Sequence, residues 1–158
     1  MGRRNSALET TIPSYLVARR SQDWRLAAEQ EITQQWWEAA RHDFLLFIST
    51  TVLKEVRRGD PTQAAARVAW LAGVPLLGDL PEANELAKRL LRDEIIPVVA
   101  ADDATHVALA AAHQMDFLLT WNCKHINNHN IRTRIQRACE AVGLVWPDIC
   151  TPAELMKL

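Results

Sequence analysis

Short apolar runs alternate along the chain with longer segments in which apolar residues recur every three or four positions. Four runs have the length and composition of buried strands, at residues 44–48, 74–77, 117–121 and 144–146. A weaker first strand is expected to end at Leu8, because the residues before it have little β-propensity. A turn follows it, with Pro13 expected at a first helical position.

The longer amphipathic segments predict helices over residues 23–41, 64–71, 82–94, 102–114 and 131–142. A further helix is expected to begin in the Ser-Thr-Thr cluster at residues 49–51, and to turn Val52, Leu53 and Val56 inward. Strands that alternate with helices form parallel sheets covered on both faces. The pattern therefore predicts a three-layer α/β fold with a parallel sheet flanked by helices.

Length and composition agree with this architecture. The chain has 158 residues, 49% hydrophobic and 23% charged, which fits one domain over residues 1–158 with a substantial core. The formal net charge is -1, so any affinity for nucleic acid has to come from local patches of Arg and Lys. Overall charge neither supports nor excludes RNA as a ligand.

Cysteine usage and hydropathy indicate the compartment. The three cysteines, Cys123, Cys139 and Cys150, lack the dense spacing of a secreted disulfide scaffold, so free thiols in a reducing compartment are expected. No apolar run is long enough to span a membrane, and the first residues lack the apolar core of a signal peptide. We therefore expect a cytoplasmic protein that does not associate with membranes.

Three acidic residues lie where strands of the predicted sheet end or where the following helices begin. Glu9 follows the first strand, Glu55 lies near the beginning of the helix after residues 44–48, and Asp103 opens the alanine-rich helix 102–114. In parallel sheets, ligands bind outside the carboxyl ends of the strands. Ionised carboxylates that meet there repel one another unless they take up protons or a divalent cation. Oxygen-only ligation favours Mg²⁺ or Mn²⁺.

Each of these acids also has an ordinary structural explanation. Asp102 and Asp103 could both stabilise a helix N-terminus. Of the two, we expect Asp102 to be the helix cap and Asp103 to be the metal ligand. Glu55 taken alone would be an exposed helix residue. Only the joint pattern of the three acids indicates a metal site.

At this point the chain resembles the PIN-domain ribonucleases, particularly the VapC-like toxins of bacterial type II toxin–antitoxin pairs. The resemblance spans roughly residues 6–155. The segments that carry it are Leu8–Leu16, Ser49–Val56 with Glu55, Asp103–Ala110 and Phe117–Asn122. Two positions depart from the family pattern: Glu9 stands where the family usually has an aspartate, and Asn122 stands where it has its last acid. Both departures bear on the rate and on whether one or two ions bind.

The resemblance implies a PIN-like fold and a metal-dependent endoribonuclease that cleaves single-stranded or structured RNA. Glu9, Glu55 and Asp103 would hold Mg²⁺ or Mn²⁺, and Asn122 would complete the catalytic group. The residues next to the metal or the substrate would be drawn from Thr10, Thr11, Asp102, His106, Trp121 and Lys124. The implied partners are RNA, a cognate antitoxin that covers the acidic cleft, and a second copy in a homodimer.

Two other functions remain open from the sequence. The departures at Glu9 and Asn122 could have left a catalytically weak PIN-fold module that binds RNA or protein. Alternatively, the chain could be a nuclease of RNA maturation or DNA repair with no role as a toxin.

Several other residues have competing interpretations. His106, one turn after Asp103, is either a packed residue or a contact to substrate. Cys123, His125 and His129 have the spacing of a partial zinc site that lacks a fourth ligand. The tryptophans on the helices are expected in the core or in an interface, whereas Trp121 is a candidate for stacking on RNA bases. Basic residues expected near the cleft, which could follow an RNA backbone, are Arg19, Arg20, Lys124, Arg132 and Arg134.

Overall fold

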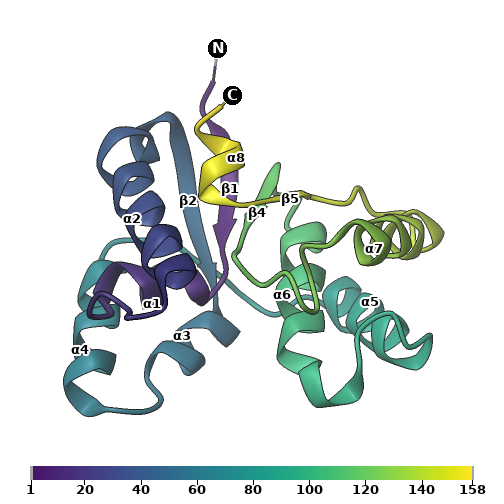
Figure 1. Ribbon diagram of the computed structural model, residues 1–158. Coiled ribbons are helices and arrows are strands. Elements are labelled where there is room, and N and C mark those ends of the chain that lie inside the picture. Colours follow the sequence, from purple (N-terminus) through teal and green to yellow (C-terminus); the bar gives the residue numbers. More distant parts are fainter. Residues whose placement is uncertain (1, 158) are drawn as a thin grey trace.

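The computed structural model describes residues 2–157, which surround a five-stranded parallel sheet with the strand order β3-β2-β1-β4-β5 (Figure 1). The strands are β1 (Arg4–Leu8), β2 (Phe44–Ser49), β3 (Leu76–Leu77), β4 (Phe117–Leu119) and β5 (Asp148–Cys150). The helices are α1 (Thr11–Val17), α2 (Trp24–Ala39), α3 (Thr50–Val56), α4 (Pro61–Trp70), α5 (Pro81–Arg92), α6 (Ala101–Ala112), α7 (His129–Ala141) and α8 (Pro152–Leu155), with short 3₁₀ turns η1 (Arg41–Asp43) and η2 (Val98–Ala100). The expected α/β fold is therefore confirmed for these residues; Met1 and Leu158 of the expected domain lie outside them.

Helices cover both faces of the sheet, and each face has its own core. Successive strand residues point to opposite faces, so Phe117 and Leu119 of β4 pack into one core and Leu118 packs into the other. The first core is built with α1, α2, α3 and α8, and includes the buried Trp36. The second is built with α5, α6 and α7. Trp70, which is 39% exposed, packs edge-on against buried Trp37 with 5.2 Å between ring centroids.

Local side-chain caps explain where several helices begin. Asp23 accepts hydrogen bonds from the main-chain N–H groups of Arg25 and Leu26, so α2 begins at Trp24 as expected. Ser49 accepts one from Val52 N–H, which starts α3 directly after β2. The Ser49 cap therefore begins α3 at the carboxyl end of β2.

The last strand differs from the prediction. Residues 144–146 are not a strand. Leu144 N–H donates to the carbonyl of Cys139 in the turn that ends α7, and Val145 is 79% exposed. The strand is instead β5, in which Ile149 pairs with Leu118 of β4 and is fully buried. The prediction was wrong because residues 144–146 follow a helix directly, and the main chain at the start of this apolar run takes part in the turn that ends the helix. The short helix α8 was not predicted, although Thr151 and Glu154 have the spacing of a capping box with Pro152 at the first helical position. Pro13 is the third residue of α1 rather than its first.

The structure also describes the three thiols and the length and hydropathy of the helices. Cys123 is exposed and Cys139 and Cys150 are buried, and all three are free, as expected. Burial raises the pKa of both Cys139 and Cys150 to about 12. Within residues 2–157, no helix is both long enough and apolar enough to cross a membrane.

Candidate active site

The three predicted acids come from three different elements at one edge of the sheet. Glu9 directly follows β1, and its N–H donates to the carbonyl of Leu119, the last residue of β4, at 3.0 Å. Glu55 lies on α3, which leaves β2, and Asp103 lies in the first turn of α6. Glu55 is near the end of α3 and not near its beginning, because α3 has only seven residues. The carboxyl ends of the central strands therefore bring Glu9 next to the helices that carry the other two acids.

Glu9 is a buried carboxylate with three hydrogen bonds to one oxygen. Glu9 is only 4% exposed. Its Oε2 accepts hydrogen bonds from Thr11 N–H at 3.0 Å, Thr11 Oγ1 at 2.6 Å and Thr120 Oγ1 at 2.8 Å. Burial raises the pKa of Glu9, although the charge of His106 and these hydrogen bonds oppose the shift. Glu9 thus holds a proton more readily than an exposed glutamate does.

Glu55 is paired with a buried histidine. His106 Nε2 lies 2.5 Å from Glu55 Oε1, and Thr10 Oγ1 donates to the same oxygen at 2.7 Å. The N–H of the imidazole is not well directed at the carboxylate, so this contact is better described as an ion pair than as an aligned hydrogen bond. Burial alone would lower the pKa of His106, but Glu55, Glu9 and Asp103 together raise it. Burial likewise opposes the net lowering of the Glu55 pKa, which His106 and Thr10 produce.

Asp103 and Asp102 have different surroundings although they are adjacent. Asp103 Oδ2 lies 3.0 Å from Nδ1 of His125, in the loop after β4. Asp102 is half-exposed and pairs with Arg58 at 3.5 Å. The prediction that Asp102 caps α6 was wrong, since the N-cap is Ala100 and Asp102 lies inside the first turn. There its charge still acts favourably on the helix dipole.

Asn122 has a local structural contact in this arrangement. Its Oδ1 accepts from His125 N–H at 3.1 Å, and its own N–H donates to Thr120 Oγ1 at 2.9 Å. Asn122 therefore shapes the loop that presents His125 to Asp103. The amide oxygen of Asn122 is neutral and bonds within the loop. The carboxylate of an aspartate at this position would add a negative charge.

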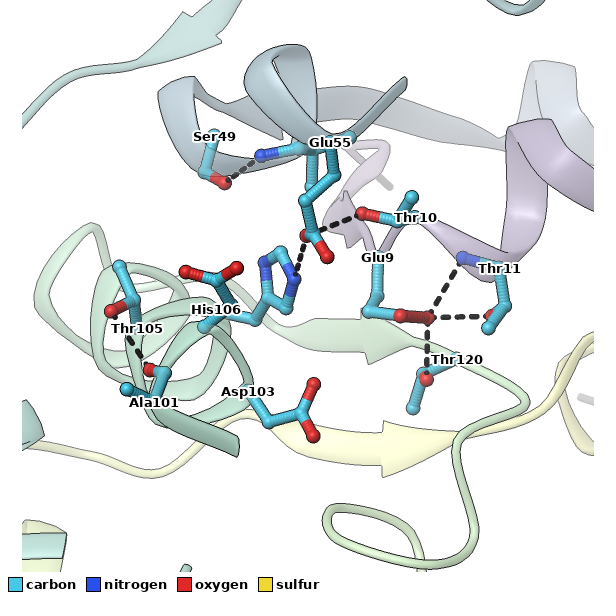
Figure 2. A network of polar contacts seen from close by, with 12 residues as sticks. Glu9, Thr10, Thr11, Ser49, Glu55, Ala101, Asp103, Thr105, His106 and Thr120 are labelled. Carbon is cyan, nitrogen blue, oxygen red and sulfur yellow. Dashed lines mark hydrogen bonds and ion pairs between the residues drawn. The ribbon is translucent and has the colours of Figure 1, made fainter. Parts of the chain in front are cut away.

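Figure 2 shows how the three carboxyl groups lie around His106. Their oxygen donors have the chemistry that suits Mg²⁺ or Mn²⁺. Within residues 2–157, however, no group of three or more His, Cys, Asp or Glu side chains is arranged to hold a metal ion. Two of the three carboxylates are paired with histidines instead. The donor set thus fits a divalent cation in kind, and an ion would have to compete with His106 and His125 for Glu55 and Asp103.

Beside the acids is a hollow of about 470 Å³ with an aromatic wall. Tyr15 and Trp121 stack there with 6.4 Å between ring centroids and 22° between planes. Trp121 N–H donates to Thr11 Oγ1 at 3.0 Å, and its indole Nε1 donates to Thr33 Oγ1 at 2.8 Å. Exposed Lys124 also lines the hollow. Thr11 therefore contacts both Glu9 and the residue that forms the aromatic wall.

Sequence reasoning missed three residues of this region. Thr120, at the end of the neighbouring strand β4, donates a hydrogen bond to Glu9. His125 pairs with Asp103, and Tyr15 stacks on Trp121. Thr120 directly follows β4 at the same sheet edge as Glu9, and this position is the signal that could have identified it. The spacing of His125 from Cys123 and His129 indicates only a partial zinc site, whereas its ring lies against Asp103 in the structure.

Comparison with known proteins defines the fold class. No protein-family model matches the chain, and no curated protein is significantly similar to it in sequence. Among solved structures, the chain is similar to one in the crystal structure of VapBC2 from Rickettsia felis bound to a DNA fragment from their promoter. The TM-score is 0.59 at 15% identity, and the match covers 93% of this chain and 98% of that chain. The predicted PIN-like α/β fold is thereby confirmed, and at this identity the likeness concerns the fold.

Proposed function

We propose that this protein is a metal-dependent endoribonuclease and the toxin of a toxin–antitoxin pair. The observation that carries the proposal is the meeting of Glu9, Glu55 and Asp103 around His106 at the carboxyl edge of the sheet. The likeness to a chain of VapBC2 across almost its whole length supports the toxin assignment and a protein partner. The homodimer and the RNA substrate belong to the same proposal.

In this proposal Glu9, Glu55 and Asp103 hold Mg²⁺ or Mn²⁺. When bound, such an ion would supply the positive charge that stabilises a phosphodiester under attack by water. Thr10 and Thr11 fix the rotamers of Glu55 and Glu9 through the hydrogen bonds described above. His106 keeps Glu55 ionised, because its positive charge lowers the pKa of that carboxyl.

The aromatic hollow gives the substrate a place beside the acids. Trp121 and Tyr15 present stacked rings, and unpaired RNA bases stack on such surfaces without strong sequence preference. The charged residues that line the hollow, Asp23, Arg25, Glu29 and Lys124, balance in sign, so stacking rather than charge supports RNA at this place. A single-stranded or looped RNA fits this combination better than a duplex, whose bases are not available for stacking.

A matched pair of variants tests the nuclease. Cleavage of a fluorescently labelled RNA is measured with Mg²⁺ or Mn²⁺, and again with EDTA. We expect D103N to lower the rate by roughly 100-fold or more, since it removes a charge that holds the ion. D102N, which changes the half-exposed neighbour, should stay within about fivefold of wild type. Equal rates for D103N and D102N, or full activity in EDTA, would refute the proposal.

One observation favours a second candidate, a PIN-fold module that binds RNA or protein without cleaving it. His106 and His125 already lie against Glu55 and Asp103, and the burial of Glu9 favours its uncharged form. Such a site could be complete without an ion. Titration with Mg²⁺ separates the candidates, because a binding module retains the labelled RNA at every Mg²⁺ concentration and never shortens it.

A further inference from the structure

A second hollow, of about 260 Å³, is lined by residues of α5 and α7 and of the segment after α5. These two helices lie on the other side of the sheet from α1 and α2 (Figure 1). The rim of the hollow carries three arginines, Arg89 from α5 and Arg134 and Arg137 from α7, with Asp93 as the one acidic residue. We call it the arginine hollow. Arg134 and Arg137 are three positions apart, so they project from the same face of α7.

The positive charge of this region is not balanced. Asp93 is shared, with Oδ2 lying 3.6 Å from Arg89 Nε and Oδ1 lying 3.2 Å from Arg92 Nε. Arg134 Nη2 donates to the main-chain carbonyl of Asp93 at 3.1 Å, which ties α7 to the end of α5 without neutralising the guanidinium. In the described part of the chain, neither Arg134 nor Arg137 is paired with an acidic side chain. Arg89 and Arg92 therefore share the one carboxylate of Asp93, and the charges of Arg134 and Arg137 have no acidic partner among the described residues.

The guanidinium of Arg89 is only partly available to a ligand. Its Nε is closed to solvent and lies 3.6 Å from Asp93 Oδ2, so an anion bound in the hollow would not contact that atom. The charges that such an anion would meet are those of Arg134 and Arg137 on α7, which line the hollow.

We infer that the arginine hollow binds the backbone phosphates of single-stranded RNA. Guanidinium groups match phosphate oxygens with two parallel N–H donors, which makes Arg the usual residue for such contacts. The chain has a formal net charge of -1, so RNA affinity requires a local patch of this kind. The arginines are distributed over two helices around an open hollow, and an extended polyanion can contact more of them than a single small anion can.

The chain path connects the arginine hollow with the acidic site. The last turn of α5 leads through residues 93–100 into the first turn of α6, which holds Asp103. His125, the partner of Asp103, lies four residues before the start of α7. Binding at the arginine hollow would thus hold a strand whose other part occupies the acidic site. This second step rests on the proposed nuclease function, whereas phosphate binding itself does not.

The test measures RNA binding without cleavage. The full chain is titrated into a 5′-fluorescein-labelled 12-nucleotide RNA in EDTA, and binding is followed by fluorescence anisotropy at several salt concentrations. R134Q/R137Q is compared with R3Q/K157Q, which removes the same number of charges at exposed positions outside α5 and α7. Each phosphate contact on a single strand contributes about 0.7 to the salt slope, or roughly fivefold in affinity at 0.1 M salt. R134Q/R137Q should therefore bind roughly 25-fold more weakly and flatten the slope by about 1.4, while R3Q/K157Q changes affinity less than about threefold.

Two further measurements keep the outcome decisive. R137Q alone removes a guanidinium that makes no hydrogen bond in the described residues, so it should fold normally and bind roughly fivefold more weakly. Inorganic phosphate is titrated separately by calorimetry. Equal losses in the two double variants, or a loss of phosphate binding with RNA affinity unchanged, would overturn the inference. Cleavage with Mg²⁺ is scored independently, so an inactive protein that still loses RNA affinity in R134Q/R137Q refutes only the nuclease proposal.

Discussion

Thr120 provides the sharpest test of how the acidic site is built. Thr120 is fully buried. Its hydroxyl donates to Glu9 Oε2 at 2.8 Å and accepts from Asn122 N–H at 2.9 Å. Thr120→Val keeps the shape of the side chain and removes both hydrogen bonds. A hydrogen bond to a charged group contributes about 1.5 to 3 kcal/mol and a neutral one about 0.5 to 1.5 kcal/mol. We expect Thr120→Val to lower the free energy of unfolding by roughly 2 to 4 kcal/mol at pH 7.5.

The matched control is Thr120→Ser, which keeps the hydroxyl and loses only a methyl group, at a cost of about 1 kcal/mol. Urea unfolding followed by circular dichroism measures both variants. Because the folded pKa of Glu9 is raised above its unfolded value, the folded protein binds this proton more tightly, and stability increases as the pH falls through the folded pKa. The difference between the variants should shrink over the same pH range, since a neutral Glu9 needs the Thr120 donor less.

The reasoning would be refuted by equal unfolding free energies for the two variants. It would also be refuted by a difference that stays constant while Glu9 titrates. Either result would mean that the hydroxyl of Thr120 does not support the charge on this carboxylate.

Three other predictions follow from the same structure. The ion pair of His106 with Glu55 should stabilise the protein fully below the unfolded histidine pKa and lose this effect as the pH rises through the raised folded pKa. Thermal unfolding of His106→Gln should therefore depend less on pH than that of wild type in the range above the ordinary histidine pKa, and an equal dependence would contradict the ion pair. Trp121→Ala should weaken RNA binding by about 5- to 150-fold in an anisotropy titration, whereas Trp121→Phe should retain most of the affinity, because stacking contributes about 1 to 3 kcal/mol per base; equal losses would argue against stacking. Ile149→Ala should cost about 2 to 5 kcal/mol in urea unfolding, whereas Val145→Ala should change stability by less than about 0.5 kcal/mol, and the reverse order would contradict the position of β5.

Local sequence signals predicted most of the elements because they depend on neighbouring residues. Asp23 and Ser49 cap their helices through main-chain groups two or three positions away, and the periodicity of α5 is visible without any partner. The final strand was misplaced for a related reason. Residues 144–146 and 148–150 are both apolar enough for a strand, and only pairing with β4 distinguishes them.

The same distinction applies to the acidic site. Parallel topology requires strand ends to meet at one edge, so the sequence indicated that Glu9, Glu55 and Asp103 would come together. It could not show that His106 would pair with Glu55 or that His125 would pair with Asp103. The choice between a histidine packed in the core and one beside a carboxylate depends on how α3 and α6 lie against each other.

The sequence by itself therefore determined the alternation of strands and helices, the parallel sheet and the edge at which the acids gather. These properties follow from periodicity and capping, which depend on residues a few positions apart, and from the order in which strands and helices alternate along the chain. Only the tertiary structure decided the partners of each carboxylate, the role of Thr120 and the gathering of arginines from α5 and α7. Those contacts join residues many positions apart, and their distances are fixed by the packing of helices on the sheet rather than by any local pattern.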